Sequence, residues 1–541
     1  MMLSFFNNNK NSITLIFFSL FFILGFNIYD DYGISIDEDN TRLNGLVSLK
    51  YIFSIFEIEP SNYFKNIPDI NEWSESGIGF IFDLPTAFLE YFLNIEDSRN
   101  YYLMRHWVNF IFFFIGVWYF YLVIKLRFNS KYFALLGALF LIMTPRIFAD
   151  SFYNNKDIIF LSLIIITTYY AIKLIEKNNL LYSFLFSFTA ALSIGIRVIG
   201  VVLPLILIFV FIINILRNEK SRYKIIKVFL SFLIFLPFLI IMFYPFLWEN
   251  PIQNFFLIFN KLKNFDINIY NFFLGKYISA ENIPWYYSIV WIFISTPIFY
   301  TIFFLFGFYM ILKRLIKRLF KIEKNNSYND LWRGPKELQD IIHLLIIFIP
   351  IFAIIIFDST LYNGWRHLYF IYPSLIFISL FGLNIIRIKY FKKVKILFLA
   401  LVLLIMSPTM MWMIKNHPHQ YVYFNTFLNG KYDKYFEMDY WGVSNYNSLI
   451  YISSNTKKKI TVSNFGNSDL NLSKSLLPKN LRKKIIISGT FDNSDFIINN
   501  FTFWKGRNLK KEKLLNKNFE KYYEIKVDDV SINVIYKKRN G

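Results

Sequence analysis

Two adjacent carboxylates, Asp37 and Glu38, follow the first apolar run of the chain and are the first side chains with evident chemical potential. Neighbouring carboxylates can divide two tasks, because one accepts a proton from a hydroxyl or amine while the other orients that group or binds a metal. The same pair can equally be two solvated acids of a polar loop. Asp37 and Glu38 are therefore candidate catalytic residues, with the acidic loop as the alternative.

Further acids and cations stand at the ends of other apolar runs. Asp150 and Asp157 are further candidate site residues, although Asp157 can also cap a helix or pair with its dipole. The nearby cations can hold a phosphate group, or can simply extend to the lipid headgroups. These cations are Lys156, Arg197, Arg366 and His367. The two histidines of His417-Pro418-His419 lack partners, so no metal site is assigned.

The elements that position these residues are membrane spans. The chain has 541 residues, of which 55% are hydrophobic and 21% aromatic, and its mean hydropathy is +0.39. A soluble protein cannot bury so many apolar side chains, whereas apolar runs of about 18–25 residues fit a bilayer. We predict about eleven spanning helices, at 12–28, 103–125, 132–148, 157–175, 180–196, 198–216, 224–246, 287–312, 340–357, 367–386 and 394–414.

Positive charge sets the predicted orientation. The net charge of +21 is compatible with nucleic-acid binding, but the cations gather in alternate short loops, as the positive-inside rule predicts, so no nucleic-acid partner is expected. The densest of these loops is 313–324. We therefore expect a cytoplasmic N-terminus, with the candidate acids, the long loop 29–102 and the C-terminal residues on the opposite side.

After the last predicted span the composition becomes polar and rich in Lys and Asn. Runs typical of strands lie at 459–463, 484–488 and 523–536, and helix-like stretches lie near 443–454 and 470–482. These runs predict a small α/β domain over 415–541. The chain has no cysteine, which excludes disulfides, thiolate metal sites and cysteine nucleophiles.

Several short stretches together resemble the GT-C superfamily of membrane glycosyltransferases, which includes the protein O-mannosyltransferases and the lipid A aminoarabinose transferases. The stretches are Asp31-Tyr-Gly-Ile-Ser-Ile-Asp37-Glu38, Pro145-Arg-Ile-Phe-Ala-Asp150-Ser-Phe-Tyr-Asn-Asn-Lys156-Asp157, Gly364-Trp-Arg-His-Leu-Tyr, Pro418-His-Gln-Tyr-Val-Tyr-Phe-Asn425 and Asp439-Tyr-Trp-Gly442. Their order and their common side of the membrane are similar to those of bacterial dolichyl-phosphate-mannose-protein mannosyltransferase-like proteins. The resemblance covers most of residues 1–445.

The resemblance implies an inverting glycosyltransferase in a bacterial inner membrane, which moves a sugar from a polyprenyl-phosphate carrier to a lipid, glycan or protein acceptor. Residues 1–414 would form a GT-C-like catalytic membrane domain, and 415–541 would lie in the periplasm. Asp37 would be the base or acceptor-orienting carboxylate, with Glu38 as its neighbour. By the same resemblance, Asp150 and Asp157 would shape the acceptor side. The phosphate-binding role of Lys156, Arg197, Arg366 and His367 is inferred from their side of the membrane. Whether the reaction needs a divalent metal stays open, because members of the superfamily differ in their metal requirement.

Two other functions stay open beside the transferase. A transporter or flippase of lipid-linked sugars would also need a cationic cavity, but its polar residues would lie near mid-span, often in repeated halves. A non-catalytic envelope scaffold would act through its C-terminal domain. The side chains of Tyr440 and Trp441 can stack on a sugar or anchor in the headgroups, and we expect anchoring. The sequence names neither the sugar nor the acceptor.

Overall fold

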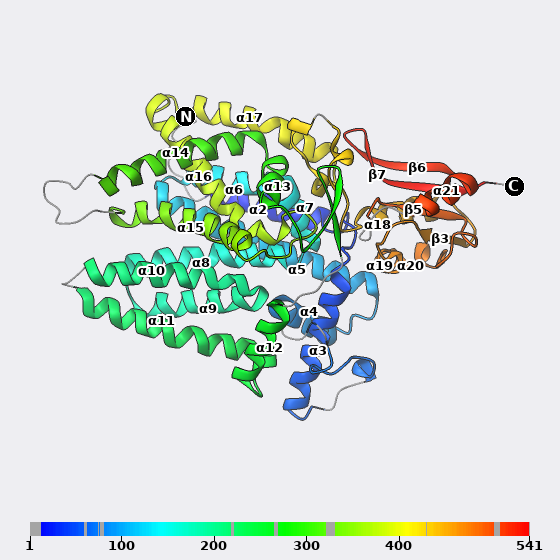
Figure 1. Ribbon diagram of the computed structural model, residues 1–541, viewed down its shortest axis with the longest axis horizontal. Coiled ribbons are helices and arrows are strands. Elements are labelled where there is room, and N and C mark those ends of the chain that lie inside the picture. Colours follow the sequence, from blue (N-terminus) through cyan, green and yellow to red (C-terminus); the bar gives the residue numbers. More distant parts are fainter. Residues whose placement is uncertain are drawn as a thin grey trace.

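The computed structural model describes residues 12–58, 62–73, 75, 80–217, 221–263, 269–320, 331–428, 430–502 and 509–539. A bundle of helices occupies most of the molecule, and a small sheet domain stands at one end of it (Figure 1). The predicted fold class, a polytopic helical membrane protein with a small C-terminal α/β domain, is confirmed. The N-terminal residues 1–11 and the loop residues 321–324, predicted to be cytoplasmic, lie outside the described residues.

Each of the predicted spans corresponds to an apolar helix of the bundle. Eight helices in the described ranges are long and apolar enough to cross a membrane, and a bent helix pair can supply a ninth. Their helical bodies are α5 (Ser98–Phe128), α8 (Asp157–Lys177), α10 (Val202–Arg217), α11 (Arg222–Phe243), α14 (Ile298–Phe320), α15 (Gly334–Ile356), α16 (Tyr372–Tyr390) and α17 (Lys395–Lys415). The bent pair is α6 (Lys131–Ile142) with α7 (Pro145–Tyr153), and two shorter apolar helices are α2 (Ser12–Ile28) and α9 (Leu180–Ile196).

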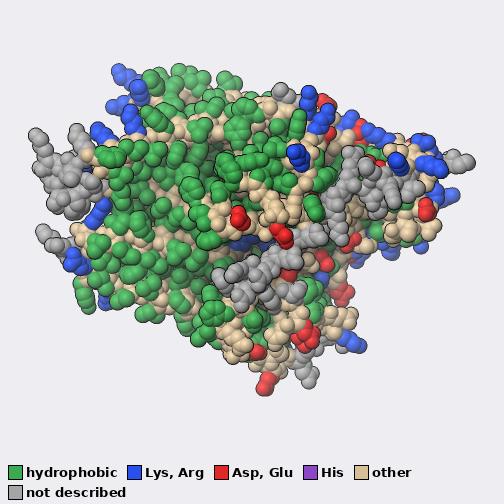
Figure 2. Space-filling view, viewed as in Figure 1, with side chains coloured by type: hydrophobic (Ala, Val, Ile, Leu, Met, Phe, Trp, Pro, Cys, Tyr) green, Lys and Arg blue, Asp and Glu red, His purple; other side chains and the backbone are tan. Residues whose placement is uncertain are grey.

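The surface of the bundle is apolar, as contact with lipid requires. Figure 2 shows hydrophobic side chains covering the bundle, with Lys and Arg side chains at the end opposite the sheet domain. Large apolar side chains point outward, among them Leu15, Ile234 and Ile396, which is 80% exposed. In water such exposure would be costly, whereas lipid tails solvate it.

Glycines let the helices of the bundle approach closely. A Cβ atom on Gly116 of α5 would lie 2.7 Å from Ser162 Oγ of α8, and one on Gly307 of α14 would lie 2.1 Å from the carbonyl oxygen of Ile378 in α16. Both distances are too short for any side chain. Small residues at crossings are how helices gain packing contacts in lipid, where burial of apolar area supplies no driving force.

Prolines break two of the predicted spans. The predicted span 132–148 is the pair α6–α7, bent by 71° where α7 begins at Pro145. The predicted start of the span 287–312 is wrong, because α13 (Tyr287–Ser295) ends before Pro297 and a separate helix, α14, begins at Ile298. Proline lacks a backbone N–H and forces the preceding residue to be extended, as Thr296 is, so the helix cannot continue.

Asn425 satisfies the carbonyl groups that the break after α13 leaves free. Its side-chain amide donates to the carbonyl oxygens of Phe293 at 2.6 Å and Thr296 at 3.0 Å, and its backbone N–H donates to that of Ile294 at 2.8 Å. Asn425 belongs to the segment 416–443, which follows α17 and packs back on the ends of the spans beside the sheet domain, here called the outer ends (Figure 1). Much of this segment is therefore part of the bundle in physical terms, and the sheet starts only after it.

Two outer segments carry the remaining elements near the membrane. The first holds α3 (Glu38–Ile55), η1 (Asn62–Phe64) and α4 (Phe80–Phe92). The second holds η4 (Pro245–Leu247), α12 (Pro251–Lys263), the antiparallel pair β1 (Tyr270–Phe273) and β2 (Lys276–Ser279), and α13. Short 3-10 turns are η2 (Val198–Val201), η5 (Arg366–Ile371), η6 (Gln420–Val422), η7 (Thr426–Leu428) and η8 (Tyr432–Lys434). Helix α3 runs across the direction of the spans (Figure 1).

The C-terminal domain is a mixed five-stranded sheet with the order β4-β3-β5-β7-β6. Its strands are β3 (Ile460–Asn464), β4 (Ile485–Ile487), β5 (Phe496–Asn499), β6 (Phe519–Val527) and β7 (Val530–Lys538), and its helices are α18 (Ser444–Ser454), α19 (Leu470–Ser475), α20 (Lys479–Arg482) and α21 (Leu509–Asn518). Strand β3 is parallel to β4 and β5, and β7 is antiparallel to β5 and β6. The predicted strand 523–536 is the hairpin β6–β7, and Pro478 divides the predicted helix 470–482.

We expect Asn425→Ala to destabilise the bundle by about 1–3 kcal/mol, because it leaves buried carbonyl groups without a donor. Thermal unfolding of the purified protein in detergent measures the change. Asn455→Ala is the control, since the amide of Asn455 caps the exposed end of α18 and loses a bond that water replaces. An equal loss of thermal stability in the two variants would contradict the capping role of Asn425.

The buried carboxyl group of Glu437, in the segment 416–443, should make the stability of the protein depend on pH. Burial raises the pKa of this 8% exposed carboxyl, and the nearby Asp439 raises it further, from 4.5 to about 8. The folded state therefore keeps a proton that the unfolded state loses, so the free energy of unfolding falls as pH rises from about 4.5 to about 8.

The Glu437→Gln variant has no carboxyl proton at this position, so this fall in the free energy of unfolding should disappear. We expect the variant to become progressively more stable than the wild type between pH 5 and pH 8, by up to a few kcal/mol, since one pKa unit corresponds to about 1.4 kcal/mol. Melting temperatures at pH 5, 6.5 and 8 measure the trend, with the exposed Glu520→Gln as control. A difference from wild type that does not change with pH would rule out a buried protonated Glu437.

Candidate functional site

Asp37 presents its carboxylate at the outer ends of the spans. It stands directly before α3 in a helical backbone conformation, and its side chain makes no capping hydrogen bond. The side chain is 33% exposed, and its Oδ2 lies 3.5 Å from Nη1 of Arg366. The carboxylate is thus open to solvent on one side and faces a guanidinium on the other.

Glu38 lies behind Asp37 and is buried. Its Oε1 accepts a hydrogen bond from the backbone N–H of Ser35 at 2.8 Å, and its Oε2 lies 3.1 Å from Nε2 of His106 on α5. These bonds fix the turn before α3 against α5. The structure therefore separates the predicted pair into an exposed carboxylate and a buried one that holds the turn.

Asp157, the first residue of α8, joins two arginines in the interior. Its Oδ1 pairs with Nη2 of Arg197, which ends α9, and its Oδ2 lies 3.2 Å from Nη1 of Arg366 in η5. The α8 N-terminus adds favourable backbone dipoles for this anion. Asp157 and Arg366 are 2% and 3% exposed, and a buried ion pair of this kind persists only when every charge has partners.

Asp150 is fully buried beneath this pair. It accepts hydrogen bonds from the hydroxyl of Tyr153 at 2.6 Å and from the side-chain amide of Asn154 at 3.0 Å. The same Asn154 amide donates to Oδ2 of Asp157 at 3.0 Å. Asn154 therefore connects the two carboxylates that the sequence predicts for the acceptor side, and both lie deeper than Asp37.

Lys156 is mostly buried and pairs with a glutamate of the first outer segment, not with Asp157. Its Nζ lies 3.4 Å from Oε2 of Glu75 in the first outer segment. Burial lowers the pKa of Lys156, but the carboxylates of Glu75, Asp37 and Asp83 outweigh it, so the pKa ends above its usual value and Lys156 is a cation. Burial raises the pKa of Asp83 itself to about 6, although Arg105 donates to it at 2.8 Å.

Arg366 is held between two aromatic side chains. The guanidinium carbon lies 4.9 Å from the ring centre of Tyr362 and 4.6 Å from that of Trp441. The expected headgroup anchoring of Tyr440 and Trp441 is wrong, because these side chains are only 3% and 2% exposed and lie inside the protein. The Trp441 ring instead packs against a buried cation.

Several buried nitrogens of this cluster make no hydrogen bond among the described residues. They are Arg197 Nε, Arg366 Nε, His367 Nδ1 and Trp441 Nε1. A buried donor without an acceptor costs about 1–3 kcal/mol, so such groups in a folded protein usually mark a ligand or water position. Guanidinium and indole N–H groups donate, and an oxyanion is the acceptor they suit best.

The structure thus brings together Asp37, Asp157, Arg197, Arg366 and His367, and places Lys156 at the edge of that group. Sequence reasoning missed Glu75, His106, Asn154 and Trp441, all of which contact predicted site residues. Asn154 and Trp441 lie within the sequence motifs given above. The motifs therefore pointed to these two residues but did not indicate what each one contacts. In the described parts of the chain, no three His, Asp or Glu side chains are arranged to hold a metal ion.

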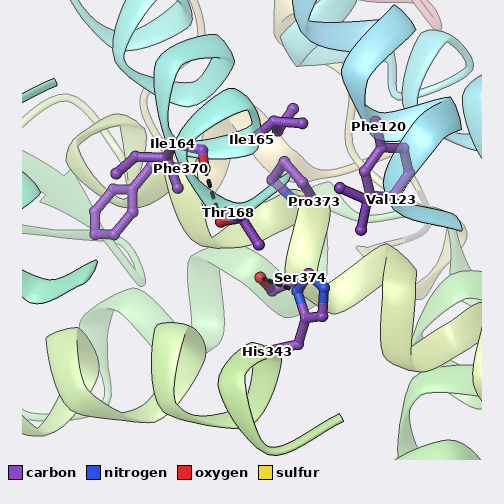
Figure 3. A pocket seen from close by; sticks show the side chains of 9 residues that line it. All are labelled: Phe120, Val123, Ile164, Ile165, Thr168, His343, Phe370, Pro373 and Ser374. Carbon is purple, nitrogen blue, oxygen red and sulfur yellow. Dashed lines mark hydrogen bonds between the residues drawn. The ribbon is translucent and has the colours of Figure 1, made fainter. Parts of the chain in front are cut away.

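Two cavities lie outside this cluster. A cavity of about 10 Å³ sits within the spans, where His343 meets Ser374 at 2.9 Å, and holds little more than a water molecule (Figure 3). A second, of about 340 Å³, opens at the outer end of α15 and is lined by Glu281, Trp285 and Asp358 among others. Neither contains a predicted site residue. The mid-span polar group of Figure 3 is too confined to pass a sugar.

Comparison with known proteins bears on this arrangement. Residues 87–241 match the family model described as dolichyl-phosphate-mannose-protein mannosyltransferase. A sequence search of the curated proteins finds no match to the chain.

Solved structures are similar in fold. The apo structure of ArnT from Cupriavidus metallidurans has a TM-score of 0.50 and 9% identity, covering 97% of this chain and 98% of that one. The structure of the same protein bound to undecaprenyl phosphate gives a TM-score of 0.47 with 10% identity and the same coverage. The archaeal oligosaccharyltransferase AglB from Archaeoglobus fulgidus, in complex with an inhibitory peptide and a dolichol-phosphate, gives 0.43 with 11% identity, covering 86% and 66%. The resemblance to the GT-C superfamily is thereby confirmed, by the family model over residues 87–241 and by the fold of ArnT over nearly the whole chain.

Proposed function

We propose that this protein is an inverting glycosyltransferase that takes a sugar from a polyprenyl-phosphate carrier and transfers it to a hydroxyl or amine at the periplasmic face of a bacterial inner membrane. The observation that carries the proposal is the pairing of one exposed carboxylate, Asp37, with a buried arginine whose Nε has no partner among the described residues. A carboxylate can take the acceptor proton, and unpartnered guanidinium N–H groups can take a phosphate. Both groups meet at the outer ends of the spans, where an acceptor outside the membrane has access.

The donor phosphate would lie against Arg366 and Arg197, with Lys156 as a third cation. Both arginines keep an unpartnered Nε while their terminal nitrogens bind Asp157, so this carboxylate orients the arginines without using all their donors. Negative charge grows on the phosphate oxygens as the bond to the sugar breaks. Preorganised cations in a water-poor setting stabilise that charge most effectively, so the site needs no nucleotide-binding loop.

The acceptor would approach from the side of Asp37. Its nucleophilic oxygen or nitrogen attacks the anomeric carbon opposite the phosphate, and Asp37 accepts the proton as the new bond forms. The bond from the anomeric carbon to the phosphate oxygen breaks, and its electron pair leaves with the carrier phosphate. Attack opposite the leaving group inverts the anomeric centre.

Two comparisons support this assignment. The matching family model is named for dolichyl-phosphate-mannose, a lipid-phosphate sugar, and ArnT, whose apo form shares the fold of this chain, has also been solved with undecaprenyl phosphate. Such carriers fit a site whose cations lie at the membrane surface. The side chains named perform each of these steps.

Asp37→Asn should lower transfer by about 10²–10⁴-fold, the usual contribution of a general base, while insertion into the membrane stays intact. The measurement compares envelope glycans and lipid-linked sugars in a deletion strain that carries either the wild type or the variant at equal expression. Asp39→Asn is the matched control, because Asp39 lies two residues along, is exposed, and accepts a side-chain hydrogen bond from Tyr102. Full restoration of the glycan by Asp37→Asn would refute the proposed base.

The proposed sidedness can be tested directly, because the chain has no cysteine of its own. Single variants Thr490→Cys, in the exposed C-terminal domain, and Lys393→Cys, in a predicted cytoplasmic loop, report opposite sides. A membrane-impermeant maleimide should label Thr490→Cys in spheroplasts and Lys393→Cys only after lysis. Labelling in the reverse pattern would place the site in the cytoplasm and exclude a periplasmic acceptor.

A further inference from the structure

We propose that Trp441 is a positioning residue, through which the C-terminal domain holds Asp37 and Arg366 in their reacting geometry. The proposal rests on the proposed function of the Asp37–Arg366 site and assigns the C-terminal domain a part in it. Three sets of contacts carry the argument: one to the arginine, one to the loop of Asp37, and one to the sheet.

The first contact fixes the arginine. The Trp441 ring lies 4.6 Å from the Arg366 guanidinium carbon, and both side chains are almost fully buried. A cation over an aromatic face is attracted most strongly where water is excluded. In this orientation a single nitrogen, Nη1, lies 3.5 Å from Asp37 and 3.2 Å from Asp157. A freely rotating guanidinium could not keep both distances.

The second contact fixes the loop before Asp37. The carbonyl oxygen of Trp441 accepts a hydrogen bond from the backbone N–H of Ile36 at 3.2 Å. The two segments lie so close that a Cβ atom on Gly33 would be 2.2 Å from the carbonyl oxygen of Val443. Trp441 therefore contacts the chain one residue before the proposed base and, through its ring, the proposed phosphate ligand.

The third set of contacts anchors the Trp441 segment to the C-terminal sheet domain. The carbonyl oxygen of Asp439 accepts from Asn500 at 3.1 Å and from the hydroxyl of Thr502 at 2.8 Å. On the other side of Trp441, the Asn533 amide of β7 donates to Ser444 Oγ at 2.8 Å and to Asn445 Oδ1 at 2.9 Å. All six residues that make these bonds are buried, so water does not replace the bonds readily.

The carboxylate of Asp439 completes the anchor. It accepts from the backbone N–H groups of Val443 and Ser444, each at 3.1 Å, and so closes the turn that follows Trp441. Burial raises the pKa of Asp439, and these hydrogen bonds oppose it, leaving a value of about 7. The turn, the ring and the sheet thus form one continuous path from β7 to the site.

The test uses the full-length protein in nanodiscs, with undecaprenyl phosphate as the probe for the donor phosphate. We expect Trp441→Leu to weaken its binding by roughly tenfold or more, because a desolvated ring–cation contact is lost. Trp441→Phe keeps an aromatic face over Arg366 and should stay within about threefold of the wild type. Asn533→Ala, which touches neither Asp37 nor Arg366, should weaken binding in the same direction as Trp441→Leu.

Trp291→Leu is the matched control. Trp291 is equally buried and also packs on an arginine, Arg146, at 5.4 Å, but it does not contact Asp37 or Arg366. This variant should lose thermal stability, as Trp441→Leu does, and keep the affinity for undecaprenyl phosphate. Envelope glycan in the complemented deletion strain gives the second readout, and Trp441→Leu should lower it while Trp441→Phe restores it.

Two results would overturn the positioning role. One is unchanged binding and glycan in Trp441→Leu, and the other is an equal loss in Trp441→Phe and Trp441→Leu, which would show that the aromatic face is not the cause. Failure of the underlying function looks different: the wild type would not bind undecaprenyl phosphate, and Asp37→Asn would restore the glycan.

Discussion

The outer half of this protein is organised around one buried carboxylate, Asp157, which pairs with Arg197 and Arg366. The three residues begin α8, end α9 and begin η5, so the ion cluster ties the outer ends of three membrane elements together. Removing Asp157 would take a buried carboxylate partner from both arginines, which is far more costly than removing an exposed pair. The cluster therefore holds the three elements together and also orients the two arginines of the proposed phosphate site.

The membrane explains why the polar groups lie at the ends of the spans. Within lipid, backbone groups must be satisfied internally, and the breaks at Pro145 and Pro297 occur where other protein segments cover them. The segment 416–443 supplies that cover, through Asn425 on α13 and through the carbonyl oxygen of Tyr423, which accepts from Arg146 at 2.9 Å. The same returning segment then leads to Trp441. Closure of the bundle and support of the site are thus provided by one stretch of chain.

Sequence alone predicted the spans well, because long apolar runs have few alternatives to a bilayer. It also predicted that Asp37, Asp157, Arg197 and Arg366 share one side of the membrane, because loop charge fixes orientation. It could not predict which acid pairs with which cation, since that depends on how helices far apart in sequence pack. Strand β5 (Phe496–Asn499) was missed because its three apolar residues and one asparagine form too short a pattern to identify a strand.

The hydrogen bond between Ile36 and Trp441 links residues that are far apart in the sequence, and this has a consequence for biosynthesis. A polytopic protein is synthesised from its N-terminus, so the loop of Asp37 leaves the ribosome long before Trp441 does. During that interval the carboxylate lacks the partner that sets its position. A nascent chain would therefore be inserted before Asp37, Arg366 and Trp441 are in contact, and their arrangement would be completed only after the segment of Trp441 has docked.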